Sequence, residues 1–107
     1  MRRGEVWWTE LPAPARRRPV VLLSRDEAYQ VRELVTVAPV TTRIRSIPSE
    51  VQLGKAEGLP KKCVVNLDTI TTIPKRLLAE RICLLPEGVI QNIENAIRFS
   101  LGMRRAE

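Results

Sequence analysis

Histidine is absent from this chain of 107 residues, and cysteine, phenylalanine and tyrosine are scarce. The lack of histidine removes the most common general base of enzymes and every zinc site that needs an imidazole ligand. The two cysteines, Cys63 and Cys83, are 20 positions apart and belong to no CxxC pair, so they form no metal-binding pattern. We therefore predict that the protein uses no metal and no cofactor.

Long apolar runs are also missing. No run approaches the roughly 18–20 residues that a membrane-spanning helix needs. The first five residues carry charges of both signs, and no apolar stretch follows them as it would in a secretory signal. We therefore expect a cytoplasmic protein, and we interpret Cys63 and Cys83, which lie in apolar runs, as buried free thiols.

The composition is that of a globular protein with an excess of positive charge. Hydrophobic residues make up 44% of the chain and charged residues 28%. Eighteen basic residues against twelve acidic ones give a net charge of +6. Residues 1–45 hold nine basic and five acidic side chains, so most of the excess is there. A polyanionic partner is one explanation, and solubility alone is the other.

Patterns typical of short β-strands dominate the chain up to residue 85. Aromatic and β-branched residues, or continuous apolar runs between turn formers, predict strands. These are expected at 5–11, 19–24, 34–41, 50–53 and 81–85, with 63–67 and 70–73 as one strand or two interrupted near Asp68. Short helical turns are expected within 26–33 and 74–78, and Pro39 is expected to bend or bulge its strand.

The last segment changes to a helical period. Its apolar residues recur at i, i+3 or i+4, and i+7, which indicates an amphipathic helix. Pro86 suits its first position and Gly102 its end. The predicted fold is mainly β with a C-terminal helix (α+β), as a small SH3-like barrel of five to six strands. The apolar stripe is Val89, Ile90, Ile93, Ala96, Ile97 and Leu101.

Five motifs follow one another along the chain, at residues 3–7 (Arg-Gly-Glu-Val-Trp), 18–22 (Arg-Pro-Val-Val-Leu), 37–41 (Val-Ala-Pro-Val-Thr), 64–73 (Val-Val-Asn-Leu-Asp-Thr-Ile-Thr-Thr-Ile) and 81–85 (Arg-Ile-Cys-Leu-Leu). Each alone is common. Together, in this order and spacing, they resemble the MazF/PemK family of toxin endoribonucleases. Two features depart from the family's pattern: the first loop is short and lacks an acid and glycines, and Cys63 stands where a serine often begins the fifth strand.

The resemblance implies a homodimeric, MazF/CcdB-like barrel, with residues 1–107 forming a single toxin domain. It implies an mRNA interferase that cleaves single-stranded RNA at short sequences without metal. The products would be a 2′,3′-cyclic phosphate and a free 5′-hydroxyl. A cognate, MazE-like antitoxin would neutralise the toxin by covering its active site.

The resemblance also places the family's catalytic pair at Arg18, in the Arg-Pro motif, and Thr41, at the end of Ala-Pro-Val-Thr. A guanidinium fork suits Arg18 to binding two phosphate oxygens in the transition state, with proton donation to the leaving oxygen as a second role. The hydroxyl of Thr41 can donate to a phosphate oxygen. Without histidine, catalysis would depend mostly on positioning and electrostatics.

Five further residues beside this pair are predicted to bind RNA. The arginines among them would attract the phosphate backbone, although a charged run is more often a solvated surface. They are Arg16, Arg17, Thr42, Arg43 and Arg45.

Four other side chains have two interpretations each. Trp7 and Trp8 are adjacent on a strand and must point to opposite faces, so one is expected in the core. The other either stacks on a base or packs against the protein. Asn66 and Asp68 either contact a base edge or form a turn at a strand break.

Two competing functions remain open at this point. A CcdB-like gyrase poison shares this type of barrel and would not need Arg18 or Thr41 for catalysis. A basic SH3-like module could bind nucleic acid without cutting it. For the assembly, the helix stripe and residues 82–85 offer more apolar surface than one small sheet needs. We therefore expect a two-fold dimer with a shared basic groove.

Overall fold

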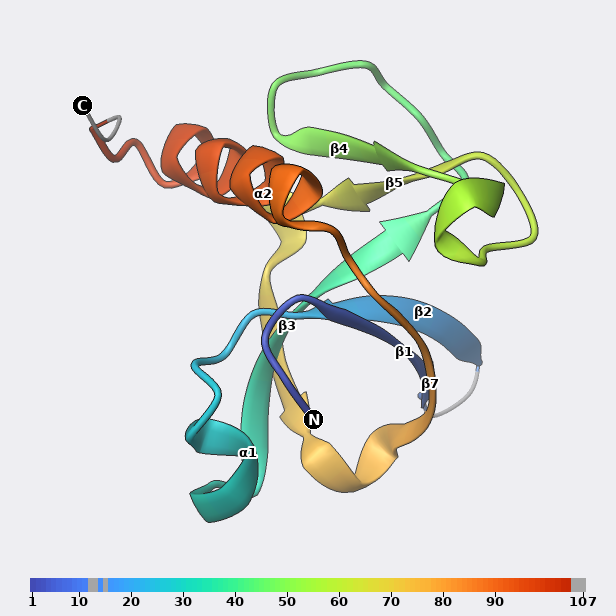
Figure 1. The fold of residues 1–107 in the computed structure, drawn as a ribbon, viewed down its shortest axis with the longest axis vertical. Coiled ribbons are helices and arrows are strands. Elements are labelled where there is room, and N and C mark those ends of the chain that lie inside the picture. The colour runs from blue at the N-terminus through green and yellow to red at the C-terminus, as the bar shows by residue number, and fades with distance from the viewer. Residues whose placement is uncertain (12–13, 15, 105–107) are drawn as a thin grey trace.

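The computed structural model of the chain describes residues 1–11, 14 and 16–104, and it shows a mainly β protein with one C-terminal helix (Figure 1). The predicted fold class is confirmed. The strands are β1 (Glu5–Glu10), β2 (Arg17–Leu22), β3 (Leu34–Thr41), β4 (Glu50–Leu53), β5 (Cys63–Asn66), β6 (Thr71–Pro74) and β7 (Leu78–Leu84). The helices are α1 (Ala28–Val31) and α2 (Glu87–Ser100), with 3₁₀ turns η1 (Lys55–Glu57), η2 (Leu67–Thr69) and η3 (Lys75–Leu77).

The strands form one strongly curled antiparallel sheet in the order β4-β5-β3-β2-β1-β7, with β6 paired to β3. The strand β3 connects its two parts. Residues 34–39 of β3 pair with β6 and β2, and Val40 and Thr41 pair with β5. Pro39 lies where β3 leaves β2 for β5, and its missing N–H suits a point where a ladder ends. The end of β3 therefore lies between two groups of strands, with β2 and β6 on one part of β3 and β5 on the other.

The apolar residues form two clusters, one on each side of this sheet. One cluster lies under α2 and includes Val6, Val21 and Val65, and the other includes Leu22, Tyr29 and Val37. The helix α2 lies beside β4 and β5 (Figure 1). Its apolar stripe packs mostly on the chain's own core: five of the six residues are buried there or pack against it. Those five are Val89, Ile90, Ile93, Ala96 and Ile97, whereas Leu101 is 62% exposed.

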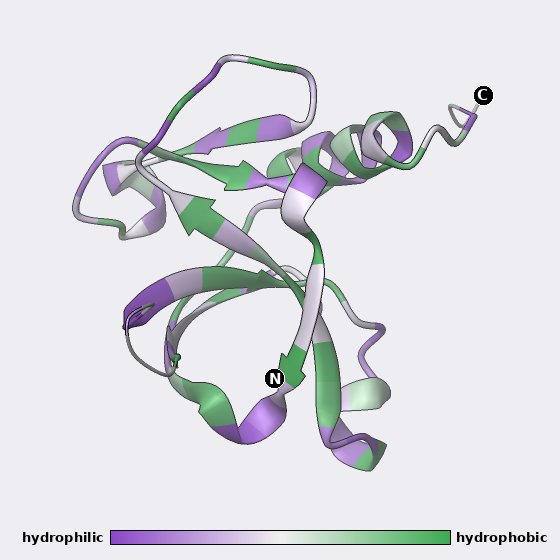
Figure 2. Cartoon of the chain, turned by 180° about the vertical axis from the view of Figure 1, so that it is seen from behind, coloured by the Kyte–Doolittle hydropathy of each residue, from purple (hydrophilic) through white to green (hydrophobic). Residues whose placement is uncertain are grey.

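The strand β2 begins earlier than its apolar residues predict. Arg17 and Arg18 pair with Glu10 and Thr9 of β1, so both arginines lie on a strand and not in the preceding loop. A backbone bond from Leu11 N–H to the Arg16 carbonyl (3.0 Å) closes this hairpin. Figure 2 shows the hydrophilic start and hydrophobic end of β2. Most of the short first loop lies outside the described residues, since residues 12, 13 and 15 are not among them.

Residues 63–67 and 70–73, predicted as one strand or two, form two strands, because the Asn66 side chain accepts the Asp68 N–H and turns the chain into η2. The sheet therefore has seven strands where five to six were expected. The last strand begins at Leu78, before the predicted 81–85. Pro86 is the N-cap of α2 rather than its first helical residue.

Candidate active site

A basic pocket opens at the point where β3 leaves β2. It has a volume of about 160 Å³. It is lined by side chains from β2, from the end of β3 and the loop that follows, and from β4, β5 and η2. These residues, called the basic pocket below, are Arg18, Pro39, Thr41, Arg43, Arg45, Glu50, Asn66 and Thr69.

The strand register explains why Arg18 and Thr41 meet in this pocket. Antiparallel pairing sets Val20 opposite Pro39, and the same register extended by two residues sets Arg18 opposite Thr41. Residues separated by two lie on the same face of a strand. The paired ladder ends at Pro39, and Thr41 pairs instead with Val64 of β5. The gap this leaves beside β2 gives both side chains access to a ligand.

The hydroxyl of Thr41 is oriented by the backbone that follows it. Its Oγ1 accepts a hydrogen bond from the Arg43 N–H at 3.1 Å. Because a hydroxyl has one proton to donate and two lone pairs, this leaves the Thr41 proton available for an oxygen in the pocket. The same bond ties the position of Arg43 to that of Thr41.

The predicted RNA-binding arginines divide into two groups. Arg43 and Arg45 line the basic pocket with Arg18, and none of the ion pairs found in the described residues involves these three. Arg17 is paired: its Nη2 lies 3.0 Å from Glu80 Oε2, and its guanidinium lies 5.0 Å from the centre of the Trp8 ring. Arg17 and the exposed Arg16 do not line the basic pocket, nor do they line the apolar pocket described below.

Glu50 also lines the basic pocket, although its sequence context predicted no functional role. Its Oε1 accepts the N–H groups of Arg45 (2.9 Å) and Ser46 (3.0 Å). Ser46 has φ = 56°, a left-handed conformation that a serine adopts only with support from its surroundings. Glu50 thus holds the loop that carries Arg43 and Arg45. The alternating sequence of β4 predicts only that Glu50 lies on a half-exposed strand. It does not indicate that Glu50 would hold this loop.

The turn between β5 and β6 supplies another wall. Asn66 lines the basic pocket while its Oδ1 accepts the Asp68 N–H at 2.9 Å. Asp68 Oδ2 accepts a hydrogen bond from the hydroxyl of the buried Ser49. The turn-forming interpretation therefore describes both residues, and Asn66 in addition faces the pocket. Thr69 completes this wall and was not predicted.

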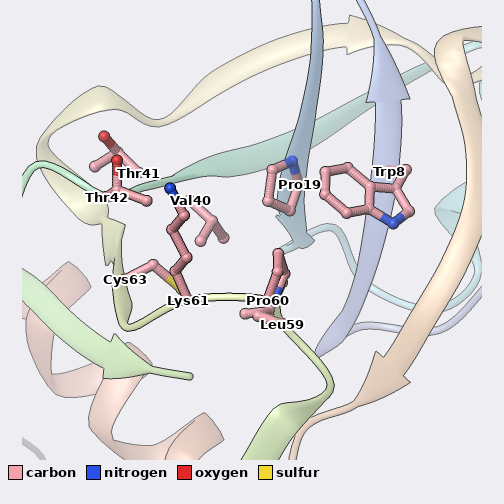
Figure 3. A pocket seen from close by; sticks show the side chains of 9 residues that line it. All are labelled: Trp8, Pro19, Val40, Thr41, Thr42, Leu59, Pro60, Lys61 and Cys63. Carbon is pink, nitrogen blue, oxygen red and sulfur yellow. The ribbon is translucent and has the colours of Figure 1, made fainter. Parts of the chain in front are cut away.

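An apolar pocket of about 120 Å³ adjoins the basic one (Figure 3). Thr41 lines both pockets, and Thr42 lines only this second one. The residues of the apolar pocket are Trp8, Pro19, Val40, Thr41, Thr42, Leu59, Pro60, Lys61 and Cys63. Trp7, on the other face of β1, packs against the cluster around Leu22 and donates its Nε1–H to Glu5. Trp8 is therefore the tryptophan that faces a pocket.

The two cysteines are free thiols. Cys63 is 4% exposed and Cys83 is half-buried. Burial raises the pKa of both thiols, and the charge of Glu57 raises it further. A thiol that stays protonated at neutral pH is a poor nucleophile and a poor metal ligand. Among the residues that the structure describes, no group of three or more His, Cys, Asp or Glu could hold a metal ion.

The structure is a small curled β-sheet closed by one helix, and in its described part three arginines that form no ion pair lie around a hydroxyl, an arrangement suited to binding a polyanion. Comparison with known proteins identifies the family. Residues 2–101 match the model of the family described as "PemK-like, MazF-like toxin of type II toxin-antitoxin system". The chain belongs to this family. In the described part of the chain, no helix combines the length and hydrophobicity needed to span a bilayer.

Individual relatives agree with this assignment. The chain is 38% identical over 104 residues to the "Probable endoribonuclease MazF5" of Mycobacterium tuberculosis, covering 96% of this chain and 94% of that protein. The fold is similar to that of the Mycobacterium tuberculosis toxin MazF-mt6, with a TM-score of 0.87, 29% identity and 94% and 99% of the two chains covered. It is also similar to a MazE-MazF structure from Deinococcus radiodurans (TM-score 0.81, 28% identity, 97% of both chains). The protein is a MazF-like endoribonuclease toxin.

Proposed function

We propose that this toxin cleaves single-stranded RNA at short sequences, without metal, through Arg18 and Thr41. The observation that supports this most directly is the basic pocket, where Arg18, Thr41, Arg43 and Arg45 line one cavity. Their side-chain donors can surround a phosphate group. We expect the protein to act in the cytoplasm on cellular RNA.

The chemistry follows from the groups present. The 2′-hydroxyl of the RNA gives up its proton to water and its oxygen attacks the adjacent phosphorus. The P–O5′ bond breaks, the 5′-oxygen takes up a proton, and a 2′,3′-cyclic phosphate and a 5′-hydroxyl result. The guanidinium of Arg18 can bind two equatorial oxygens as their negative charge grows. The Thr41 hydroxyl, held by the Arg43 N–H, donates to a phosphate oxygen and fixes its orientation. Proton donation to the leaving 5′-oxygen is a second role for Arg18.

The test is cleavage of a long RNA by metal-free protein in the presence of EDTA. We expect discrete fragments with 5′-hydroxyl ends, which end mapping across the RNA would identify. Arg18→Ala should give no fragments, whereas Arg32→Ala, an exposed arginine after α1 that lines neither pocket, should cleave as the wild type does. Intact RNA with the wild-type protein would favour a gyrase poison or a binding module instead.

We further propose that the toxin forms a homodimer and is neutralised by an antitoxin. Four large apolar residues in and beyond the last turn of α2 and in β7 are at least 37% exposed, which offers surface to a partner: Leu84, Phe99, Leu101 and Met103. Two basic pockets in one dimer, at a formal charge of +12, would attract RNA and an acidic antitoxin segment to the same groove. The MazE-MazF relative supports the antitoxin partner. Light scattering at micromolar protein tests the dimer, and a monomer with full activity would contradict it.

A further inference from the structure

We infer that the apolar pocket binds one nucleobase of the RNA, next to the phosphate held in the basic pocket. This inference rests on the proposed function, because the base belongs to the same RNA chain. It assigns a ligand to a cavity that catalysis does not use, and it assigns a role to Trp8.

The shape and lining of the cavity suit one planar, partly polar ring. Figure 3 shows Trp8 and Pro19 at one end and the hydroxyls of Thr41 and Thr42 with the amine of Lys61 at the other. A nucleobase has this polarity, since its faces are apolar and its edges carry donors and acceptors. The volume of about 120 Å³ is well below the ~300–1,000 Å³ typical of pockets for drug-sized molecules. The cavity therefore has room for a ring but not for a whole nucleotide.

The ring of Trp8 has a cation–π partner outside the pocket. The Arg17 guanidinium lies 5.0 Å from the centre of the ring, and Glu80 holds that guanidinium through a 3.0 Å ion pair. Arg17 does not line the apolar pocket, so it braces the ring without filling the space. A pre-positioned aromatic ring loses little conformational entropy when a base stacks on it.

The shared wall connects this cavity to the reaction. Thr41 lines both pockets, so occupants of the two cavities are separated by about the width of one side chain. A polynucleotide supplies a phosphate and a base at that separation, joined by one sugar. An apolar side chain of a protein partner would fill the cavity but would not place a phosphate beside Arg18. The continuity between the cavities therefore favours a base of the RNA.

The experiment combines a change in the protein with a change in the RNA. A short RNA containing a mapped cleavage site is made with the base removed at the nucleotide on either side of the cleaved bond. For the wild type, we expect removal at one of these positions to raise KM roughly 10-fold, within the range that base–aromatic stacking produces. For Trp8→Leu we expect a similar rise with the intact RNA and little further effect of the missing base. Equal penalties in both proteins, or none in either, would overturn the inference.

Two further measurements keep the test independent of catalysis and of folding. In Trp7→Phe protein, Trp8 is the only tryptophan, and an uncleavable RNA with a 2′-deoxy sugar at the cut site should quench its fluorescence. Unchanged emission on saturation would contradict the inference even if cleavage failed. Lys61→Ala should weaken binding of the intact RNA more than of the abasic RNA, whereas Lys62→Ala, an exposed neighbour outside the pocket, should not discriminate.

The outcomes separate this inference from the proposed function and from a protein ligand. Loss of cleavage in Arg18→Ala together with wild-type KM in Trp8→Leu would preserve the nuclease and reject the base pocket. Trp8→Leu that binds RNA normally but loses affinity for an antitoxin would assign the cavity to that partner and also reject the inference.

Discussion

The basic pocket and the apolar pocket share Thr41 but are built from opposite kinds of residue. The first brings three arginines to one cavity, and the described ion pairs leave all three without a carboxylate partner. In the second, Arg17 approaches Trp8 but is paired with Glu80 and stays outside the cavity. Arg17 and Arg18 are adjacent in sequence, yet one supports an aromatic ring and the other faces a phosphate-sized space.

The two pockets thus differ in how the charges of their neighbouring arginines are paired. An arginine in an ion pair has its field largely compensated, whereas gathered unpaired cations repel one another and are stabilised by an anion. Changing single residues of each pocket distinguishes their roles.

Replacing Arg18 should have the largest effect. Arg18→Ala should lower the cleavage rate by roughly 10²–10³-fold or more, as loss of a transition-state donor does. Arg18→Lys should also be largely inactive, because a point charge does not replace a bidentate fork. Single-turnover cleavage measures both, with circular dichroism to show that the variants are folded. A wild-type rate in either variant would remove Arg18 from the catalytic centre.

The hydroxyl of Thr41 should contribute less than the guanidinium. Thr41→Val keeps the shape and the strand preference but removes the proton donor, and we expect a loss of about 10- to 100-fold in kcat, typical of a hydrogen bond to a charged group. Thr41→Ser should recover most of it. If Thr41→Val and Thr41→Ser had the same kcat, the role of Thr41 would be packing between the two pockets.

Arg43 and Arg45 should affect binding more than chemistry. The double alanine variant should weaken RNA binding and reduce the magnitude of the salt slope, d log K/d log [salt], by roughly 1.4, at about 0.7 for each phosphate of the single strand that an arginine no longer neutralises. Arg25 and Arg32 are exposed on either side of α1 and line neither pocket. Their double alanine variant is the matched control, and an equal change in slope there would indicate a diffuse field instead of a pocket.

Glu50 should act by positioning the loop of Arg43 and Arg45. Glu50→Ala removes the acceptor of two backbone N–H groups, so we expect KM to rise about 5- to 10-fold with a smaller change in kcat. Glu50→Gln keeps an acceptor oxygen and should restore most of the activity. A Gln variant as inactive as the Ala variant, with an altered pH–rate profile, would instead show that the carboxylate takes part in proton transfer.

The cysteines should matter least. The double variant Cys63→Ala/Cys83→Ala should cleave RNA within about twofold of the wild-type rate while losing about 1–2 kcal/mol of stability, as buried truncations do. The raised pKa keeps both thiols protonated around neutral pH. The pH–rate profile between about pH 7 and 9 should therefore be the same with and without them. A displaced profile would show that Cys63 influences the pocket through its charge.

Much of the fold was predictable from local patterns. The limits of β3 and β4 agree with the predicted strands, since a β-branched run and a strict alternation each define their own period. The start of β2 was not predictable, because Arg17 and Arg18 become strand residues only by pairing with β1. The surplus of apolar surface expected on α2 is smaller than predicted, since Ile93 and Ala96 are buried in the chain's own core.

The candidate site divides in the same way. The motifs pointed to Arg18 and Thr41, and their motif positions lie on two strands whose register brings them together. Nothing in the motifs indicated that Glu50 would anchor the loop after Thr41, which carries Arg43 and Arg45. That role depends on where the chain returns into β4, which is a long-range property of the fold.

By itself, the sequence determined the class of fold, the family, and the residue types available for chemistry, because composition, periodicity and motif order are carried by the chain. Only the tertiary structure decided which arginines stay unpaired, which tryptophan faces a cavity, and that Thr41 stands between two pockets. These properties depend on which face of a strand each residue occupies and on where β3 leaves β2 for β5. Both depend on how segments distant in the sequence pack together, so local sequence patterns do not predict them.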